Sequence, residues 1–227
     1  MVKDKKVKTF LDKSLVVLKV FFAFSVLAGI AFTAGTFYPN GIAISNVNSK
    51  LDKYYVNKIK EMDLQEPEFV YNNDIQFVAS MHKCINYVNF TIPKDKRVPY
   101  EMIIGQAALE SAWGKSRFAI KGNNLFGIRT WNENTPHMLL MDVEKWPGWG
   151  VRVFASKCDS VKEYIRILNE HPAYEKFREL RLTTNDPTRL IKTLDKYSTT
   201  ADYDKRVIKV IGEIRKLEKQ WQKLYSQ

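Results

Sequence analysis

Cysteine and histidine are scarce in this chain. Its 227 residues include two cysteines, Cys84 and Cys158, and three histidines, and no CxxC pair or Cys/His cluster has the spacing of a zinc site. His82, His137 and His171 have no partners at a spacing typical of a ligand set or of a Ser or Cys triad, so we interpret them as structural. We therefore expect neither a metal nor another cofactor.

Acidic residues are fewer than basic ones, and long polar tracts are absent. The chain has 36 Lys and Arg against 25 Asp and Glu, a formal charge of +11, which favours a polyanionic neighbour. The basic residues are spread out, without the dense tracts interleaved with aromatics that a nucleic-acid groove needs, so we expect no nucleic-acid partner. With 45% hydrophobic residues, the chain is too apolar for long disorder, and its length fits one domain with a small appendage. No feature indicates an oligomeric state.

The N-terminal segment has the composition of a membrane span or an export signal. Residues 1–14 carry five lysines against two aspartates, and 15–37 are apolar except for Lys19 and a few hydroxyls. As a helix, this run reaches roughly 34 Å, enough to cross a hydrocarbon core of about 30 Å. The basic flank predicts a cytoplasmic tail at 1–14 and an outside location for everything after Tyr38. We predict an uncleaved transmembrane signal anchor at 15–37; a cleaved signal peptide, whose apolar region is usually shorter, is the alternative.

A stalk is expected to follow the span. Tyr38-Pro39-Asn40-Gly41 is typical of a turn, and apolar residues recur at helical spacing from Ser45 to Met62. This amphipathic helix either lies on anionic lipid, packs on the domain, or is a solvated connector. We interpret 38–68 as stalk and linker, and 69–227 as the globular domain.

The pattern within 69–227 predicts a mainly helical α+β domain. Helical periodicity covers 74–90, 99–113, 160–169, 187–194 and 202–224, whereas 125–130, 137–143 and 150–154 have the texture of short strands. Pro99 and Pro187 suit the first helical position, Asp186 suits an N-cap, and Ser160 to Glu163 has capping-box spacing. We expect a small β-hairpin lobe inserted among the helices.

Glu110 is the strongest candidate for a catalytic residue. It shares a helix face with Ala107 and Ile103 and lies in the last turn before Gly114, where the helix dipole and partial desolvation both disfavour its ionised form. We therefore expect a raised pKa, which would suit a general acid that protonates a glycosidic oxygen. A solvated or salt-bridged glutamate is the plainer interpretation.

Two further segments have the composition of a sugar site. Gly122 to Ile128 combines residues that tolerate left-handed backbone with apolar anchors, as in a turn entering a strand. Tyr197-Ser198-Thr199, with Tyr203, places aromatic rings and hydroxyls before the last helix. A structural turn and a core segment with a cap explain the same residues.

The motifs 109–116 (LESAWGKS), 123–128 (NNLFGI) and 197–199 (YST) resemble those of bacterial endo-β-N-acetylglucosaminidases of glycoside hydrolase family 73, over residues 75–215. His171 to Tyr174, followed by Phe177, resembles a Bax-like branch of that family. The resemblance implies a lysozyme-like fold that cleaves peptidoglycan glycan strands after N-acetylglucosamine. It places the catalytic acid at Glu110 and a cleft-lining tyrosine at Tyr197, and with these we expect Trp113, Asn124, Phe126 and Tyr203 to bind the substrate.

The second catalytic group remains open. Asp142 and Glu144 lie where the family carries such a carboxylate, as a base in an inverting enzyme or a nucleophile in a retaining one. Both are equally explained as solvated charges of the lobe, and attack by the substrate's own acetamido group needs neither. Trp131, Trp146 and Trp149 suit either sugar stacking or the core of the lobe.

We therefore predict a peptidoglycan hydrolase anchored in the bacterial inner membrane by 15–37, with its catalytic domain in the periplasm or cell-wall space. A lytic transglycosylase or muramidase of lysozyme-like fold and a non-catalytic glycan-binding scaffold are the alternatives. In that oxidising space, Cys84 and Cys158 either form a disulfide or remain two buried thiols.

Overall fold

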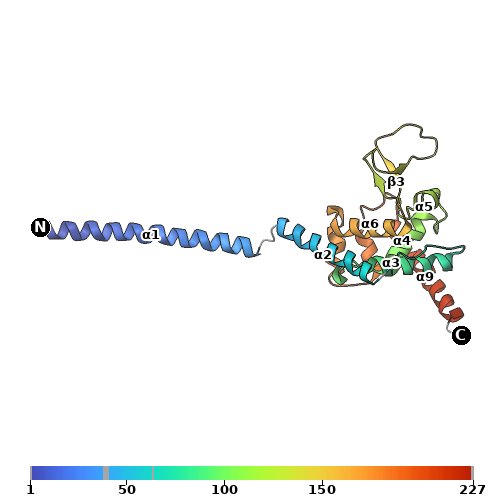
Figure 1. Cartoon of the computed structure of the whole chain (residues 1–227), viewed down its shortest axis with the longest axis horizontal. Helices are drawn as coiled ribbons and strands as arrows, with labels where there is room; N and C mark the ends of the chain where they lie inside the picture. The colour runs from blue at the N-terminus through green and yellow to red at the C-terminus, as the bar shows by residue number, and fades with distance from the viewer. Residues whose placement is uncertain (1, 38–40, 63, 226–227) are drawn as a thin grey trace. The chain divides into compact units, whose positions relative to one another are not determined.

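The computed structural model describes residues 2–37, 41–62 and 64–225, and the chain separates into two compact units, Met1–Lys58 and Ile59–Gln227. The expected turn at 38–40 lies outside the described residues. Helix α1 spans Val2–Phe37 and α2 spans Gly41–Glu61 (Figure 1), so α2 covers the predicted stalk helix and begins four residues earlier.

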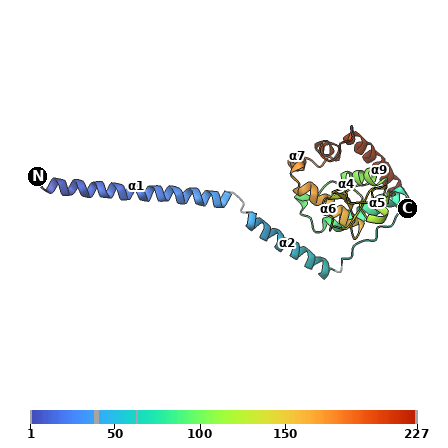
Figure 2. The ribbon, with the colours of Figure 1, turned by 90° about the horizontal axis from the view of Figure 1, so that it is seen from above.

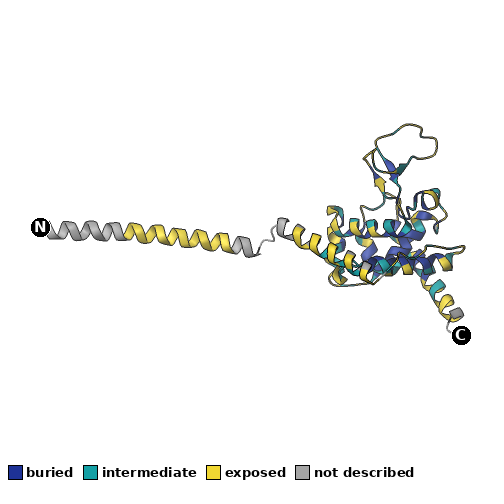
Figure 3. Ribbon diagram, viewed as in Figure 1, coloured by how far each residue is buried: buried dark blue, intermediate teal, exposed yellow. Residues whose placement is uncertain are grey.

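The apolar part of α1 is long enough to cross a membrane. Leu15–Phe32 has a mean hydropathy of 2.5, and none of this window is buried by other parts of the protein (Figure 3). Length and composition of this kind are typical of a membrane anchor and of a secretion signal. The length and composition of the N-terminal helix therefore favour an export signal or an anchor.

The second unit is mainly helical, as the sequence pattern predicts. Its longer helices are α3 (Asp74–Asn89), α4 (Tyr100–Ser111), α6 (Lys157–Glu170) and α9 (Tyr203–Tyr225). The shorter ones are α5 (Arg117–Gly122), α7 (Glu175–Arg181), α8 (Pro187–Leu190) and the 3-10 turns Lys94–Lys96, Pro172–Tyr174 and Ile191–Thr193. The sequence pattern did not indicate α5 or α7.

The caps correct two of the predicted helix starts. α6 begins three residues before Ser160 because the Ser156 side chain accepts a hydrogen bond from the Asp159 N–H at 3.0 Å, so the predicted capping box is wrong. Ser160 lies inside the helix and donates to the Lys157 carbonyl. Pro99 is the residue before α4 rather than its first residue. At α8, by contrast, Pro187 is helical and its predicted cap Asp186 accepts from the Thr188 N–H.

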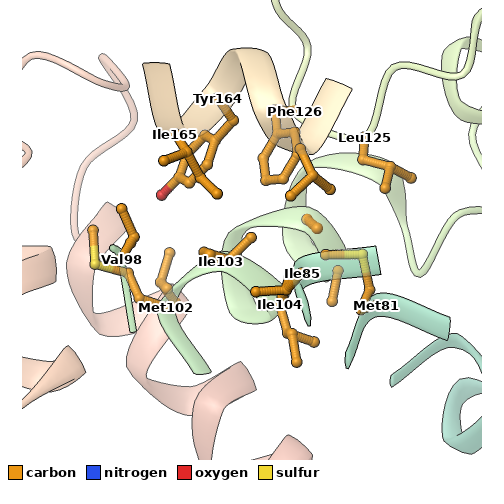
Figure 4. Close-up of a cluster of buried hydrophobic side chains, with 14 of the residues drawn as sticks. Met81, Ile85, Val98, Met102, Ile103, Ile104, Leu125, Phe126, Tyr164 and Ile165 are labelled. Atoms are coloured by element: carbon orange, nitrogen blue, oxygen red, sulfur yellow. The ribbon is translucent and has the colours of Figure 1, made fainter. Parts of the chain in front are cut away.

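Helix α4 lies in the middle of this helical body (Figures 1 and 2), and its residues 102–108 are all buried. Figure 4 shows Tyr164 and Ile165 of α6 pointing toward α4. On another side α4 packs extensively on α9. The approach is close at Gly105, where an added Cβ would lie 3.0 Å from the Ile211 Cγ1 atom. Burial of this apolar cluster stabilises the arrangement of α3, α4, α6 and α9.

A disulfide joins α3 to α6. Cys84 and Cys158 are bonded to each other, with their Cα atoms 5.4 Å apart, and both are almost fully buried. Of the two possibilities that the sequence left open, the structure has the paired one.

The β-lobe is a three-stranded antiparallel sheet rather than a hairpin. The lobe contains the strands β1 (Arg129–Thr130), β2 (His137–Met138) and β3 (Gly150–Arg152), of which Figure 1 labels β3. Their order is β1-β3-β2, so β3 pairs with both others. Val151 is opposite Arg129 on one side and Met138 on the other. The strands are shorter than predicted, but the small β-lobe within a mainly helical domain is confirmed.

Candidate functional site

Glu110 lies at the end of α4, on an accessible part of the surface. Ser111 is the last helical residue, and the next three residues, Ala112, Trp113 and Gly114, all have left-handed φ angles of 52°, 58° and 78°. The helix therefore ends abruptly one residue after Glu110. Glu110 is exposed although Ser111, the next residue, is buried, so the carboxyl group lies at the edge of the core and reaches solvent.

A directed chain of hydrogen bonds ends on this carboxyl group. The Tyr164 hydroxyl donates to the Gln106 side-chain oxygen, and the Gln106 Nε2 donates to the Tyr203 hydroxyl at 2.9 Å. The Tyr203 hydroxyl in turn donates to Glu110 Oε1 at 2.7 Å. Because the Tyr203 oxygen already accepts from Gln106, its single proton is committed to Glu110. The fully buried Gln106 thus orients the donor that faces the carboxyl group.

Burial raises the pKa of Glu110, while the Tyr203 hydrogen bond and the nearby Arg206 guanidinium act in the opposite direction. Although much of the side-chain surface is accessible, protein atoms surround the carboxyl group closely enough for desolvation to dominate. The direction agrees with the expectation from sequence. Arg206 lies one turn along α9 from Tyr203, and the sequence pattern did not predict that its charge is near Glu110.

An aromatic cluster supports the chain of hydrogen bonds. Tyr197 stacks on Tyr203, with ring centroids 5.6 Å apart, and its hydroxyl donates to the Phe126 carbonyl at 3.3 Å. Phe126 stacks on Tyr164 at 4.2 Å. Burial raises the pKa values of Tyr164, Tyr197 and Tyr203, so these hydroxyls stay protonated and remain donors.

Asn124 and Trp113 have different surroundings. The Asn124 side chain is buried, donates to the Ile128 and Arg152 carbonyls at 2.9 and 2.8 Å, and accepts from the Phe126 and Ile128 N–H groups. Its hydrogen-bonding capacity is thus used in holding the chain that enters the β-lobe. Trp113 is half-buried and packs edge-on against Phe77.

The carboxylates of the β-lobe are solvated. Asp142 and Glu144 are both exposed, in the loop between β2 and β3, and Asp142 has a left-handed φ of 67°. In the same lobe Trp131 is exposed, Trp146 packs against His137, and the Arg129 guanidinium lies 4.1 Å from the centre of the Trp149 ring. The lobe therefore presents aromatic and charged side chains at its surface.

Gln106, Tyr164 and Arg206 are site residues that sequence reasoning missed. Gln106 did carry a signal, because it is a polar residue within an otherwise apolar stretch of α4 and lies one turn before Glu110. Tyr164 and Arg206 gave none, since each comes from a separate helix.

Away from Glu110, the described residues include a cavity but no candidate metal cluster. Among the residues that the structure describes, no group of three or more His, Cys, Asp or Glu side chains is placed to hold a metal ion. A cavity of about 480 Å³ lies between α3 and α9 and contains none of the predicted site residues; it is lined by Ile75, Val78, Ala79, His82, Lys83, Asn86, Leu217, Glu218, Trp221 and Gln222.

Comparison with known proteins gives consistent matches. The family model for glucosaminidase, described as mannosyl-glycoprotein endo-beta-N-acetylglucosaminidase, matches residues 91–216. Protein bax of Escherichia coli strain K12 is 34% identical over 111 residues, which are 45% of this chain and 37% of that protein. The peptidoglycan hydrolase FlgJ of Salmonella typhimurium is 23% identical over 140 residues, 57% of this chain and 44% of the relative. The chain thus spans less than half the length of these curated relatives.

Solved structures share the fold. The glycoside hydrolase domain of Salmonella typhimurium FlgJ superposes with a TM-score of 0.54 at 21% identity, covering 68% of this chain and 96% of that domain. The catalytic domain of the autolysin Auto from Listeria monocytogenes gives 0.51 at 21% identity, covering 71% and 94%.

Proposed function

Because the chain belongs to the glucosaminidase family of glycoside hydrolases, we propose that it cleaves the β-1,4 bond after N-acetylglucosamine in peptidoglycan, with Glu110 as the general acid. Among its relatives, FlgJ is named as a peptidoglycan hydrolase, which supports this substrate. The observation that carries the proposal is the Glu110 carboxyl group itself, which is accessible, partly desolvated and hydrogen-bonded by a fixed donor.

The surroundings of Glu110 suit both halves of a proton transfer. Desolvation favours the neutral acid before the reaction, so a proton is available for the glycosidic oxygen. Because Oε1 accepts from Tyr203, the acidic proton belongs on Oε2, which is left to face the substrate. As the bond breaks, the proton moves to the departing sugar oxygen and Glu110 becomes a carboxylate. Tyr203 and Arg206 then stabilise the negative charge.

Three routes complete the reaction. A base about 6.5–9.5 Å from the acid would activate water with inversion, and a nucleophile at about 5–5.5 Å would give retention through a glycosyl-enzyme. Asp142 and Glu144 are the β-lobe carboxylates that we propose for these routes. In the third route the acetamido group of the substrate attacks, and Glu110 is the one indispensable carboxyl group. NMR of the anomeric configuration of the first product separates the inverting route from the other two, which both give retention. Loss of activity in Asp142→Asn or Glu144→Gln then separates an enzyme nucleophile from acetamido attack.

The aromatic residues near Glu110 divide into two roles in this proposal. Trp113 and Tyr197 contact the sugar, since each is partly exposed and combines an apolar ring with a polar atom. Tyr203, which the sequence also placed among the substrate-binding residues, is buried and acts through its hydrogen bond to Glu110. Phe126 and Asn124 are buried and act by supporting the tyrosine cluster and the entry to the β-lobe.

We infer that the enzyme lies on the outer face of the bacterial inner membrane. Residues 15–37 form the anchor and 1–14 a cytoplasmic tail, with 38–68 as stalk and 69–227 as the catalytic domain. Expression of the full chain with a C-terminal tag tests this, because an anchor keeps the intact chain in the membrane pellet. A shortened chain in the soluble fraction would indicate a cleaved signal.

Digestion of purified peptidoglycan by the full chain in detergent tests the activity. Mass spectrometry should find new reducing N-acetylglucosamine ends, and Glu110→Gln should abolish them. The matched control is Glu101→Gln, which removes a carboxylate from the same helix at its contact with Arg215. New 1,6-anhydromuramyl ends would show a lytic transglycosylase instead. Glycan binding without lysis, unchanged in Glu110→Gln, would show a non-catalytic module.

A further inference from the structure

We propose that Tyr71 is a positioning residue for Glu110, acting by holding the turn that ends α4. Tyr71 precedes α3 and lies outside residues 91–216, the part of the chain that the family model matches. The inference rests on the proposed function, because it assigns Tyr71 a part in placing the general acid.

The turn in question, the exit turn, consists of Ala112, Trp113 and Gly114. Its three successive left-handed φ angles include two residues other than glycine, a conformation that persists only where the surroundings hold it. Inside the turn, the Trp113 N–H donates to the Ala108 carbonyl at 2.8 Å and the Gly114 N–H donates to Ser111 Oγ at 2.7 Å. These bonds tie the turn directly to the residues on either side of Glu110.

Tyr71 closes the exit turn from outside. Its hydroxyl donates to the Gly114 carbonyl at 2.6 Å, and its ring occupies the place of a side chain at Gly114. A Cβ atom there would lie only 2.4 Å from the Tyr71 hydroxyl oxygen and 2.6 Å from its Cζ atom. A glycine at position 114 thus serves both the left-handed backbone and the close approach of Tyr71.

Aromatic contacts hold Tyr71 in this place. Its ring packs edge-on against Phe69 at 5.5 Å and against Phe77 at 5.4 Å, and Phe77 contacts Trp113 of the exit turn at 6.0 Å. The Lys157 ammonium lies 6.0 Å from the Tyr71 ring. Contacts with α3 and with the start of α6 therefore fix the orientation in which Tyr71 contacts the exit turn.

The distance that matters is the 2.7 Å between Glu110 and Tyr203, which joins two separate helices. Glu110 is two residues from Ala112, so a shift of the exit turn moves the carboxyl group relative to Tyr203 and to any bound sugar. A misplacement of about 1 Å in a catalytic group costs up to about a hundredfold in rate. Tyr71 does not touch Glu110, and so it acts through the turn.

The test compares Tyr71→Phe with Tyr100→Phe in the full chain in detergent. The first change removes only the hydroxyl that holds Gly114. The second removes a hydroxyl bonded to Asn86 at the opposite end of α4, ten residues from Glu110. Hydrogen exchange of the segment 108–116, followed by mass spectrometry, measures the exit turn, and initial rates over a range of peptidoglycan concentrations separate kcat from KM.

In Tyr71→Phe, exchange within 108–116 should be about fivefold faster, as expected for the loss of one hydrogen bond. kcat should fall about tenfold with KM unchanged within about twofold. Tyr100→Phe should leave both quantities within about twofold of the parent. Unchanged exchange or unchanged kcat in Tyr71→Phe would overturn the proposal, as would equal losses in the two variants. An inactive parent chain would refute the proposed function, and the exchange data would still show separately whether Tyr71 holds the turn.

Discussion

Removal of the Cys84–Cys158 disulfide should strongly destabilise the helical unit that contains it. The bond joins residues 74 positions apart and so closes a long loop in the unfolded chain. With the usual dependence of loop entropy on the logarithm of loop length, such a cross-link is worth about 4 kcal/mol. The double variant Cys84→Ala/Cys158→Ala removes it without leaving a free thiol in the core.

The expected change is large enough to measure by thermal unfolding. For a domain of this size, 1 kcal/mol shifts the melting temperature by about 2–4 °C, so the double variant should melt about 8–16 °C below the parent. The melt is followed by circular dichroism, which reports the helices of the domain. Reduction of the parent chain before heating should produce a comparable decrease, because it opens the same loop.

Two results would refute this reasoning. The first is a double variant that melts within about 2 °C of the parent, which would mean that the loop contributes little. The second is the titration of two free thiols in the parent chain after unfolding without reductant, which would mean that the cysteines are not paired.

Three further predictions concern the site and the lobe. Glu110→Gln should raise the melting temperature at pH 7, because ionising a desolvated carboxyl group lowers the free energy of unfolding. The increase should vanish below the ordinary pKa of glutamate, where the carboxyl group is protonated in both the folded and the unfolded chain; an equal increase at every pH would contradict this prediction. Tyr203→Phe should raise the pKa of Glu110 further and move the alkaline limb of the kcat/KM profile to higher pH, and a limb that stays in place or moves down would contradict this. Asn124→Asp loses two buried amide donations and should lower the free energy of unfolding by about 3 kcal/mol in urea, whereas the exposed control Asn134→Asp should change it by less than about 0.5 kcal/mol.

The helical elements were largely predictable because their information is local. Apolar spacing locates α3, α4 and α9, and Asp186 with Pro187 marks the start of α8. Ser156 and Ser160 show the limit of such signals. Both serines have the chemistry of a cap, and the choice between them depends on where α6 meets the rest of the core.

The site was predictable only where one segment carries it. Glu110 stands out within its own helix, and the raised pKa follows from its apolar neighbours. The donor chain to it does not, because Gln106 is 97 residues from Tyr203 and 58 from Tyr164. The strand order of the β-lobe could not be predicted for the same reason, since β3 pairs with β1, which is distant from it in sequence.

Gly105 has a consequence for protein engineering. A glycine inside a helix is an obvious position for a stabilising change to alanine, worth up to about 1 kcal/mol in helix propensity. Here the missing methyl group lets α9 lie close against α4, and α9 is the helix that carries Tyr203 to Glu110. An added Cβ would lie 3.0 Å from Ile211 Cγ1, so the Ile211 side chain, or α9 with it, would have to shift by a few tenths of an ångström. Gly105→Ala therefore changes the packing between α4 and α9, the two helices that carry Glu110 and Tyr203, as well as helix propensity.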